Sequence, residues 1–151
     1  VLLATPKLIF HLHGNIFLSK LRQNYSKMSL SVSEMQTRLI ELLKAHEGDL
    51  RITIDTPEKF EVTGTKEAMQ GKQKVDGFYF ATVVPKPKDV RFYFFPCYTD
   101  REALGALPER LQKSLKGKSC FHIKAMDDEM AGYLRDLIAR GVDVYKNKGL
   151  L

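Results

Sequence analysis

The amino-acid sequence predicts an α+β fold, in which one mainly antiparallel sheet of about five strands carries helices on one face. A helix pattern opens the domain, a block of four strand patterns follows, and helix, strand and helix patterns complete the order. The strand patterns alternate apolar and polar residues, which is typical of strands with one buried face. Strands grouped in a block, with helices at the ends, favour the α+β class.

The first helix is expected near Ser33, because Ser33 and Gln36 fit the S-x-x-Q capping box. Apolar residues then recur at helical spacing, and Gly48 supplies a stop. The apolar face of this helix must pack on another element. Its members are Met35, Leu39, Leu42 and Leu43.

Four strand patterns follow this helix. Residues 51–55 and 59–63 each alternate cleanly, with a Thr-Pro turn between them. Residues 65–76 are polar and broken by glycine, so we expect a connection with about one helical turn. The two strongest patterns, 77–84 and 90–95, flank a Pro-Lys-Pro-Lys-Asp turn and predict a hairpin. Both carry apolar residues on both faces, as do central strands that are covered on two sides.

Two or more further helices are expected in the second half of the chain. Thr99 and Glu102 fit a T-x-x-E capping box that would open a short helix, and the helical pattern resumes over residues 109–115. Asp127 is expected to cap the last helix, which carries one apolar stripe and ends at Gly141. The fifth strand lies between these helices.

Composition indicates one ordinary globular domain. The chain has 151 residues, of which 44% are hydrophobic and 28% charged. No apolar run approaches the roughly 18 residues of a membrane span, so we expect no membrane partner. Two cysteines, Cys97 and Cys120, are too few for a disulfide framework and favour a reducing, cytoplasmic location.

Residues 1–27 differ from the rest of the chain. They contain four basic and no acidic residues, whereas the remaining 20 basic and 18 acidic residues nearly balance. The net charge of +6 therefore gives little support to nucleic-acid binding. We expect residues 1–27 to be an N-terminal extension, and residues 28–151 to form the single domain. Three interpretations of this extension stay open: a targeting segment, a structured extension, or a non-native or disordered stretch from translated upstream sequence.

The strand over residues 119–125 carries a thiol and an imidazole. Because side chains alternate along a strand, Cys120 and His122 share one face, while Phe121 and Ile123 should face the helices. A Cα separation of roughly 7 Å disfavours direct contact between thiolate and imidazole, and two ligands are too few for a zinc site. We therefore expect neither a catalytic dyad nor a metal site, and interpret Cys120 and His122 as lining a surface.

The aromatic hairpin supplies further candidates. If helices cover one sheet face, either its phenylalanines or its tyrosines lie on the other, and alternation places Arg91 on the side of Tyr93. An open face of this kind would mark a ligand pocket or a partner surface, unless a loop or the C-terminal tail covers it. The candidate ligand-binding residues are Cys120, His122, Tyr79, Tyr93 and Arg91.

The stretches GFYFATVVPKPKDVRFYFFPCYTD, GKSCFHIK and DDEMAGYLRDLIARG resemble a family of small bacterial proteins. These are the YdhG-like domains of unknown function, some of which have been called frataxin-like iron-binding proteins. The resemblance covers residues 33–141 and implies a frataxin-like α/β sandwich, with the first and last helices together on one sheet face. Iron is implied by the resemblance alone, because the acidic residues between positions 34 and 55 form no ridge. No residue is carried over as an iron ligand, and no other cofactor is evident.

These observations predict a small cytoplasmic binding or chaperone-like protein, more a binder than an enzyme, whose partner is an unknown small ligand or protein. An enzyme that uses Cys120 and His122 is one alternative. A weak nucleic-acid-binding module, built from turn lysines and strand aromatics, is another, although lysines at turns usually only solvate loops. The sequence contains none of the common phosphate-binding, acyl-transfer or protease motifs.

Overall fold

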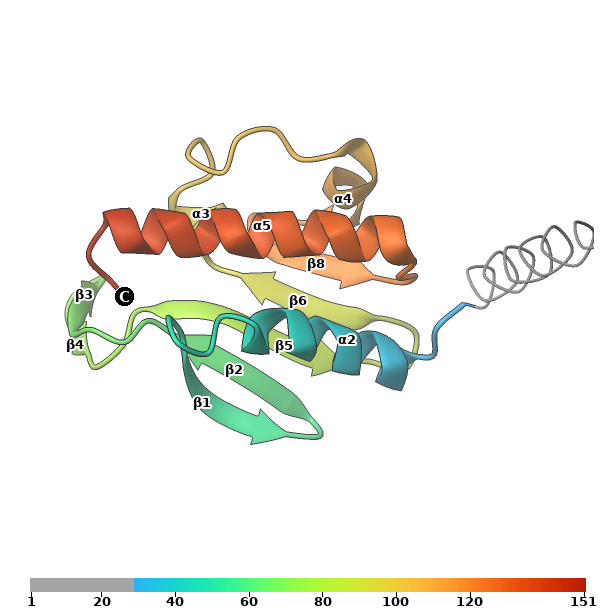
Figure 1. Ribbon diagram of the computed structural model, residues 1–151, viewed down its shortest axis with the longest axis horizontal. Helices are drawn as coiled ribbons and strands as arrows, with labels where there is room; N and C mark the ends of the chain where they lie inside the picture. Colours follow the sequence, from blue (N-terminus) through green and yellow to red (C-terminus); the bar gives the residue numbers. More distant parts are fainter. Residues whose placement is uncertain (1–28) are drawn as a thin grey trace, which may run out of the picture.

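The computed structural model describes residues 29–151, so the predictions for residues 1–27 and for a start at Met28 lie outside it. Six strands form one antiparallel sheet in the order β1-β2-β5-β6-β8-β7, and two long helices lie side by side across one of its faces (Figure 1). The predicted α+β class is confirmed. The sheet comprises β1 (Arg51–Thr56), β2 (Lys59–Thr63), β5 (Tyr79–Pro85), β6 (Val90–Phe94), β7 (Leu115–Lys116) and β8 (Cys120–Ile123), and the helices are α2 (Val32–Lys44) and α5 (Asp128–Asn147).

The N-cap of helix α2 lies two residues before the predicted cap, Ser33. Ser31 is the N-cap: its hydroxyl accepts from the Glu34 N–H at 3.2 Å, and the Glu34 carboxylate accepts from the Ser31 N–H at 2.8 Å. These reciprocal bonds lower the pKa of Glu34. The helix ends at Lys44, before Gly48, and buries Met35, Leu39 and Leu43.

The connections between the main elements differ from the sequence patterns at two places. The segment expected to hold a helical turn instead forms a small hairpin of β3 (Ala68–Gln70) and β4 (Gln73–Val75), turned by Gly71 at φ 63°. The prediction of a short helix that begins at Thr99 is also wrong. Helix α3 (Pro96–Thr99) begins earlier, because Pro96 provides its first turn. The chain then passes through a turn at residues 101–104 and an irregular stretch at 105–108 to α4 (Glu109–Ser114).

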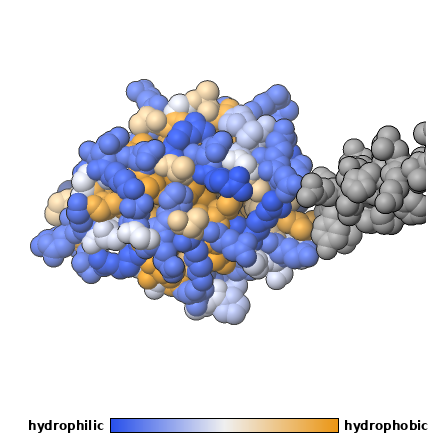
Figure 2. All heavy atoms as spheres, in the orientation of Figure 1, coloured by the Kyte–Doolittle hydropathy of each residue, from blue (hydrophilic) through white to orange (hydrophobic). Residues whose placement is uncertain are grey.

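The core lies between the two long helices and the sheet face beneath them. Strand register aligns Phe60, Val83, Phe92 and Phe121 in one row across four strands, and all four are fully buried. Leu134, Leu137 and Ile138 of α5 are buried in the same cluster. The outer surface of the helix layer is largely hydrophilic, with apolar side chains showing between charged ones (Figure 2). Among residues 29–151, no helix is long and apolar enough to cross a membrane.

Helix α5 continues through the position that was expected to end it. Asp127 caps its start by accepting from the Met130 N–H at 2.9 Å, as predicted, but the helix runs past Gly141 to Asn147. A Cβ atom on Gly141 would lie 2.4 Å from Cζ of the buried Phe94 ring. The glycine therefore permits a close approach of α5 to β6, and does not terminate the helix.

Tyr145 fastens the C-terminal part of α5 to the sheet. Its ring is fully buried and meets Phe80 edge to face at 5.0 Å, and its hydroxyl donates to the Tyr79 carbonyl oxygen. Burial raises the pKa of this hydroxyl, so it stays a donor.

Tyr145→Phe should lower the free energy of unfolding by about 1 kcal/mol, because it removes one buried hydrogen bond while preserving the ring. Urea denaturation measures the loss. Tyr133→Phe is the matched control, since the Tyr133 hydroxyl bonds Glu129 at the exposed surface of the same helix, at 3.0 Å. Equal losses in the two variants would contradict an anchoring role for Tyr145.

Candidate functional site

The sheet face that points away from α2 and α5, called here the open face, brings the predicted site residues together. Within residues 29–151, α2 and α5 cover β5 and β6 on one side, and no helix covers their other side (Figure 1), so for this part of the chain the expectation of cover on two sides is wrong. Register places Thr82 beside Tyr93 and Tyr93 beside Cys120, while Arg91 lies beside His122. The face carries two rows across the strands, which are Glu61, Thr82, Tyr93, Cys120 and Lys116, and Val84, Arg91 and His122.

Tyr79 joins this face because the register between β2 and β5 shifts next to it. The Tyr79 hydroxyl donates to Thr82 Oγ1 at 2.8 Å, on the open side. Phe80 turns to the core, where its ring meets that of Phe94 at 5.3 Å. Of the two arrangements that the sequence allowed, the tyrosines therefore occupy the open face.

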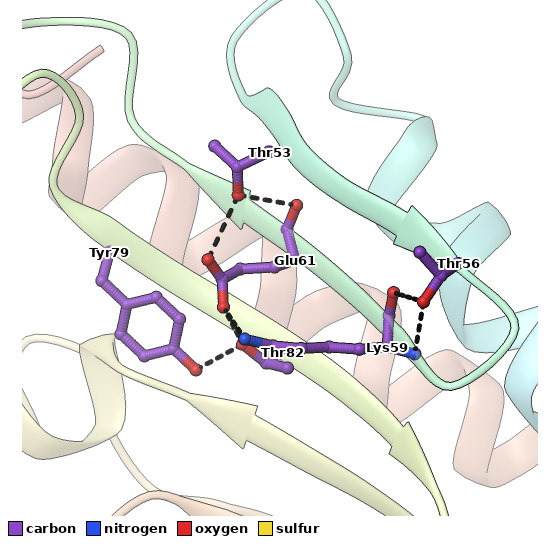
Figure 3. Close-up of polar contacts among 6 residues, drawn as sticks. All are labelled: Thr53, Thr56, Lys59, Glu61, Tyr79 and Thr82. Carbon is purple, nitrogen blue, oxygen red and sulfur yellow. Dashed lines mark hydrogen bonds and ion pairs between the residues drawn. The ribbon is translucent and has the colours of Figure 1, made fainter.

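A chain of hydrogen bonds runs from Tyr79 across the open face to a carboxylate (Figure 3). Thr82 donates to Glu61 Oε2 at 3.2 Å, and Lys59 Nζ lies 2.6 Å from the same oxygen. Thr53 donates to the other oxygen, Oε1, at 3.2 Å. Burial raises the pKa of Tyr79 to about 12, so its hydroxyl stays protonated and can act as the first donor.

The basic end of the open face is built around a buried carboxylate. Asp89 is 5% exposed and accepts from Arg91 Nε at 2.7 Å. Arg91 Nη1 lies 3.0 Å from His122 Nε2. Since a guanidinium can only donate, Nε2 must accept, which leaves the imidazole proton on Nδ1, 3.9 Å from Asp89 Oδ2. Burial and the Arg91 charge lower the pKa of His122, which keeps the imidazole neutral near neutral pH.

Cys120 is not activated as a nucleophile. It is half-buried beside Tyr93, and burial raises its pKa, so the thiol stays protonated near neutral pH. The accepting nitrogen of His122 is occupied by Arg91. Cys97 is buried in α3, and residues 29–151 contain no group of three or more metal-ligating side chains. The arrangement can hold a ligand by hydrogen bonds and charge, and it contains no thiolate–imidazole pair.

Three side chains that organise the open face were not among the predicted site residues: Glu61, Thr82 and Asp89. Alternation does indicate that Glu61 points outward, but no local signal shows that Thr82 donates to it. Asp89 lies in the β5–β6 turn, where an acidic residue is ordinarily a solvated turn former, and only the fold reveals its burial. Comparison with protein-family models, curated proteins and solved structures found no match, so the YdhG-like resemblance stays a prediction.

Proposed function

We propose that this protein is a binding module that holds a small acidic ligand on the open face of its sheet. One observation carries the proposal: Cys120, His122, Tyr79, Tyr93 and Arg91 lie on the sheet face opposite α2 and α5, and a buried carboxylate fixes the guanidinium among them. A buried, ion-paired acid is costly to maintain unless its partner is needed in one position. Asp89 thus supports a role for Arg91 in binding.

The remaining donors of Arg91 indicate the chemistry of the ligand. Its Nε and Nη1 atoms contact Asp89 and His122, and Nη2 has no partner among the described residues. A carboxylate that approaches Nη2 would gain a charge-assisted hydrogen bond. Tyr93 lies two residues from Arg91 on the same face of β6, and Tyr79 bonds Thr82 in the row of Tyr93, so an aromatic acid fits the face best. The free thiols support a cytoplasmic location for the module.

The proposal is tested by titrating isotope-labelled protein with benzoate, phenylacetate and 4-hydroxyphenylacetate. We expect amide shifts at residues 79–84, 91–93 and 120–122. Arg91→Met should weaken binding of the acid with the highest affinity by about tenfold or more, which is the loss expected for one charge-assisted hydrogen bond. Arg135→Met removes the same charge from the exposed side of α5 and should change nothing.

Three results would each contradict this function. One is the absence of shifts with all three acids at millimolar concentration. Another is a set of shifts confined to α2 and the outer side of α5. The third is affinity that survives Arg91→Met as well as it survives Arg135→Met. The neutral amide of the best acid serves as the ligand control, because it keeps the ring and lacks the charge that Arg91 would bind.

A further inference from the structure

A hollow lies at the β8 edge of the sheet, next to the open face. Strand β7 is two residues long and pairs only with Cys120 and Phe121, so within residues 29–151 the outer edge of β8 has no partner strand beyond Phe121. Helix α4 and the start of α5 flank this edge (Figure 1). A cavity of about 240 Å³ opens here and reaches His122 of the open face.

Basic side chains dominate the lining of this hollow, and no acidic residue lines it. Lys113 pairs with Glu109, and Arg110 pairs with two carboxylates at the start of α5. Lys116 and Lys124 form no ion pair with any residue between positions 29 and 151. Five of the eight lining residues are basic, which are Arg110, Lys113, Lys116, His122 and Lys124.

Arg110 is held in a fixed position at the rim. Its Nη1 atom lies 2.8 Å from Asp127 Oδ2 and 2.8 Å from Glu129 Oε2. Asp127 also caps α5 by accepting from the Met130 N–H, so the guanidinium is tied to the helix start. These hydrogen bonds raise the pKa of Arg110. Its charge is compensated, and the uncompensated charge of the hollow comes from Lys116 and Lys124.

The positive charge of the hollow affects the pKa of His122. Burial is the main cause of its lowered pKa and Arg91 the next, but Lys116 and Lys124 also disfavour its protonated form, while Asp89 opposes them. Positive charge thus gathers around the hollow from Lys116 of β7 and from Lys124, which directly follows β8. An anion placed between these groups would be attracted by two lysines that have no ion-pair partner in the described part of the chain.

We propose that this hollow binds the phosphate group of a small ligand. Lysines from different elements suit phosphate, because an ammonium acts as a point charge on a tetrahedral dianion from any side. Pockets for drug-sized ligands span about 300–1,000 Å³, so a hollow of about 240 Å³ fits a phosphate with a body of few atoms. Ala125 and Met130 would contact that body. The site shares His122 and Lys116 with the open face and does not require a ligand there.

The test is a titration of the full chain with inorganic phosphate at constant ionic strength, with sodium chloride as the balancing salt. We expect saturable shifts at the amides of Lys116, His122 and Lys124, and a rise in the pKa of His122, because a bound anion stabilises the imidazolium. The His122 ring signal is assigned with His122→Gln. Lys116→Gln combined with Lys124→Gln should weaken phosphate binding by about tenfold or more.

Matched controls separate this site from general charge effects. Lys66→Gln combined with Lys72→Gln removes two lysines near the β3–β4 hairpin and should leave phosphate affinity unchanged. Arg91→Met should weaken the binding of aromatic acids on the open face by about tenfold or more but keep phosphate binding, so the two proposals can fail separately. Linear shifts that chloride reproduces, or equal losses in the two double-lysine variants, would overturn the site. Acetate that binds as tightly as phosphate would overturn the assignment to phosphate.

Discussion

Gly141→Ala should lower the free energy of unfolding by about 1–3 kcal/mol, the cost of inserting a methyl group into a filled core. The new Cβ would lie 2.4 Å from Phe94 Cζ and 3.2 Å from Pro96 Cγ. Phe94 is fully buried among other aromatic rings, so it cannot move aside without displacing Phe80 or Phe92. Urea denaturation measures the change.

Gly132→Ala is the matched control in the same helix. A Cβ on Gly132 meets no atom within 4 Å outside the helix, so this change should stabilise the protein by about 0.5–1 kcal/mol through helix propensity alone. The same glycine-to-alanine substitution is thus expected to stabilise the protein at position 132 and to destabilise it at position 141, more than two helical turns away. Phe94→Leu should recover part of the loss in the Gly141→Ala background, because the shorter side chain makes room. Two changes of the same sign and size would refute the close approach at Gly141.

Asp89→Ala should lower the free energy of unfolding by about 1.5–3 kcal/mol, the range for a hydrogen bond to a charged group. The loss should lie near the lower limit, because the Arg91 side chain is 30% exposed and water can solvate its freed charge. The change also removes the carboxylate that raises the pKa of His122, so that pKa should fall further. Urea denaturation and an NMR titration of His122 measure the two effects.

Asp89→Asn separates the hydrogen bond from the charge. Its amide oxygen can still accept from Arg91 Nε, so we expect a smaller loss of stability than with alanine. The pKa of His122 should nevertheless fall, since the negative charge is gone. Equal stability losses for alanine and asparagine, or a His122 pKa that rises in either variant, would show that Asp89 does not hold the basic end of the open face.

Strand alternation was the most informative sequence signal. It placed Cys120 and His122 on one face and buried Phe121 and Ile123 under the helices, as the structure shows. Alternation succeeds here because the strand is regular, and a period of two fixes every side chain once one is known. It could not assign Tyr79, because the β2–β5 register shifts beside that residue.

Other features depend on partners that are distant in sequence. Glu61 and Thr82 are 21 residues apart, and Arg91 and His122 are 31 apart, so neither contact has a local signature. The prediction that the last helix ends at Gly141 was wrong. Glycine is compatible with both a helix end and a close approach between elements, and only the nearby Phe94 ring decides between the two. The basic hollow required the short β7 strand, which no periodicity revealed.

The one-sided sheet separates two kinds of requirement along the same strands. In β6 and β8, one set of alternate residues supports folding, and the intervening set, with Arg91, Tyr93, Cys120 and His122, faces outward. A scaffold of this kind can be given a new ligand preference by recombining outward residues, while the inward residues remain constant. Saturation libraries at Tyr93, Cys120 and His122, with Arg91 kept as the partner of the buried Asp89, should yield many folded members, which makes the domain a practical starting point for binder engineering.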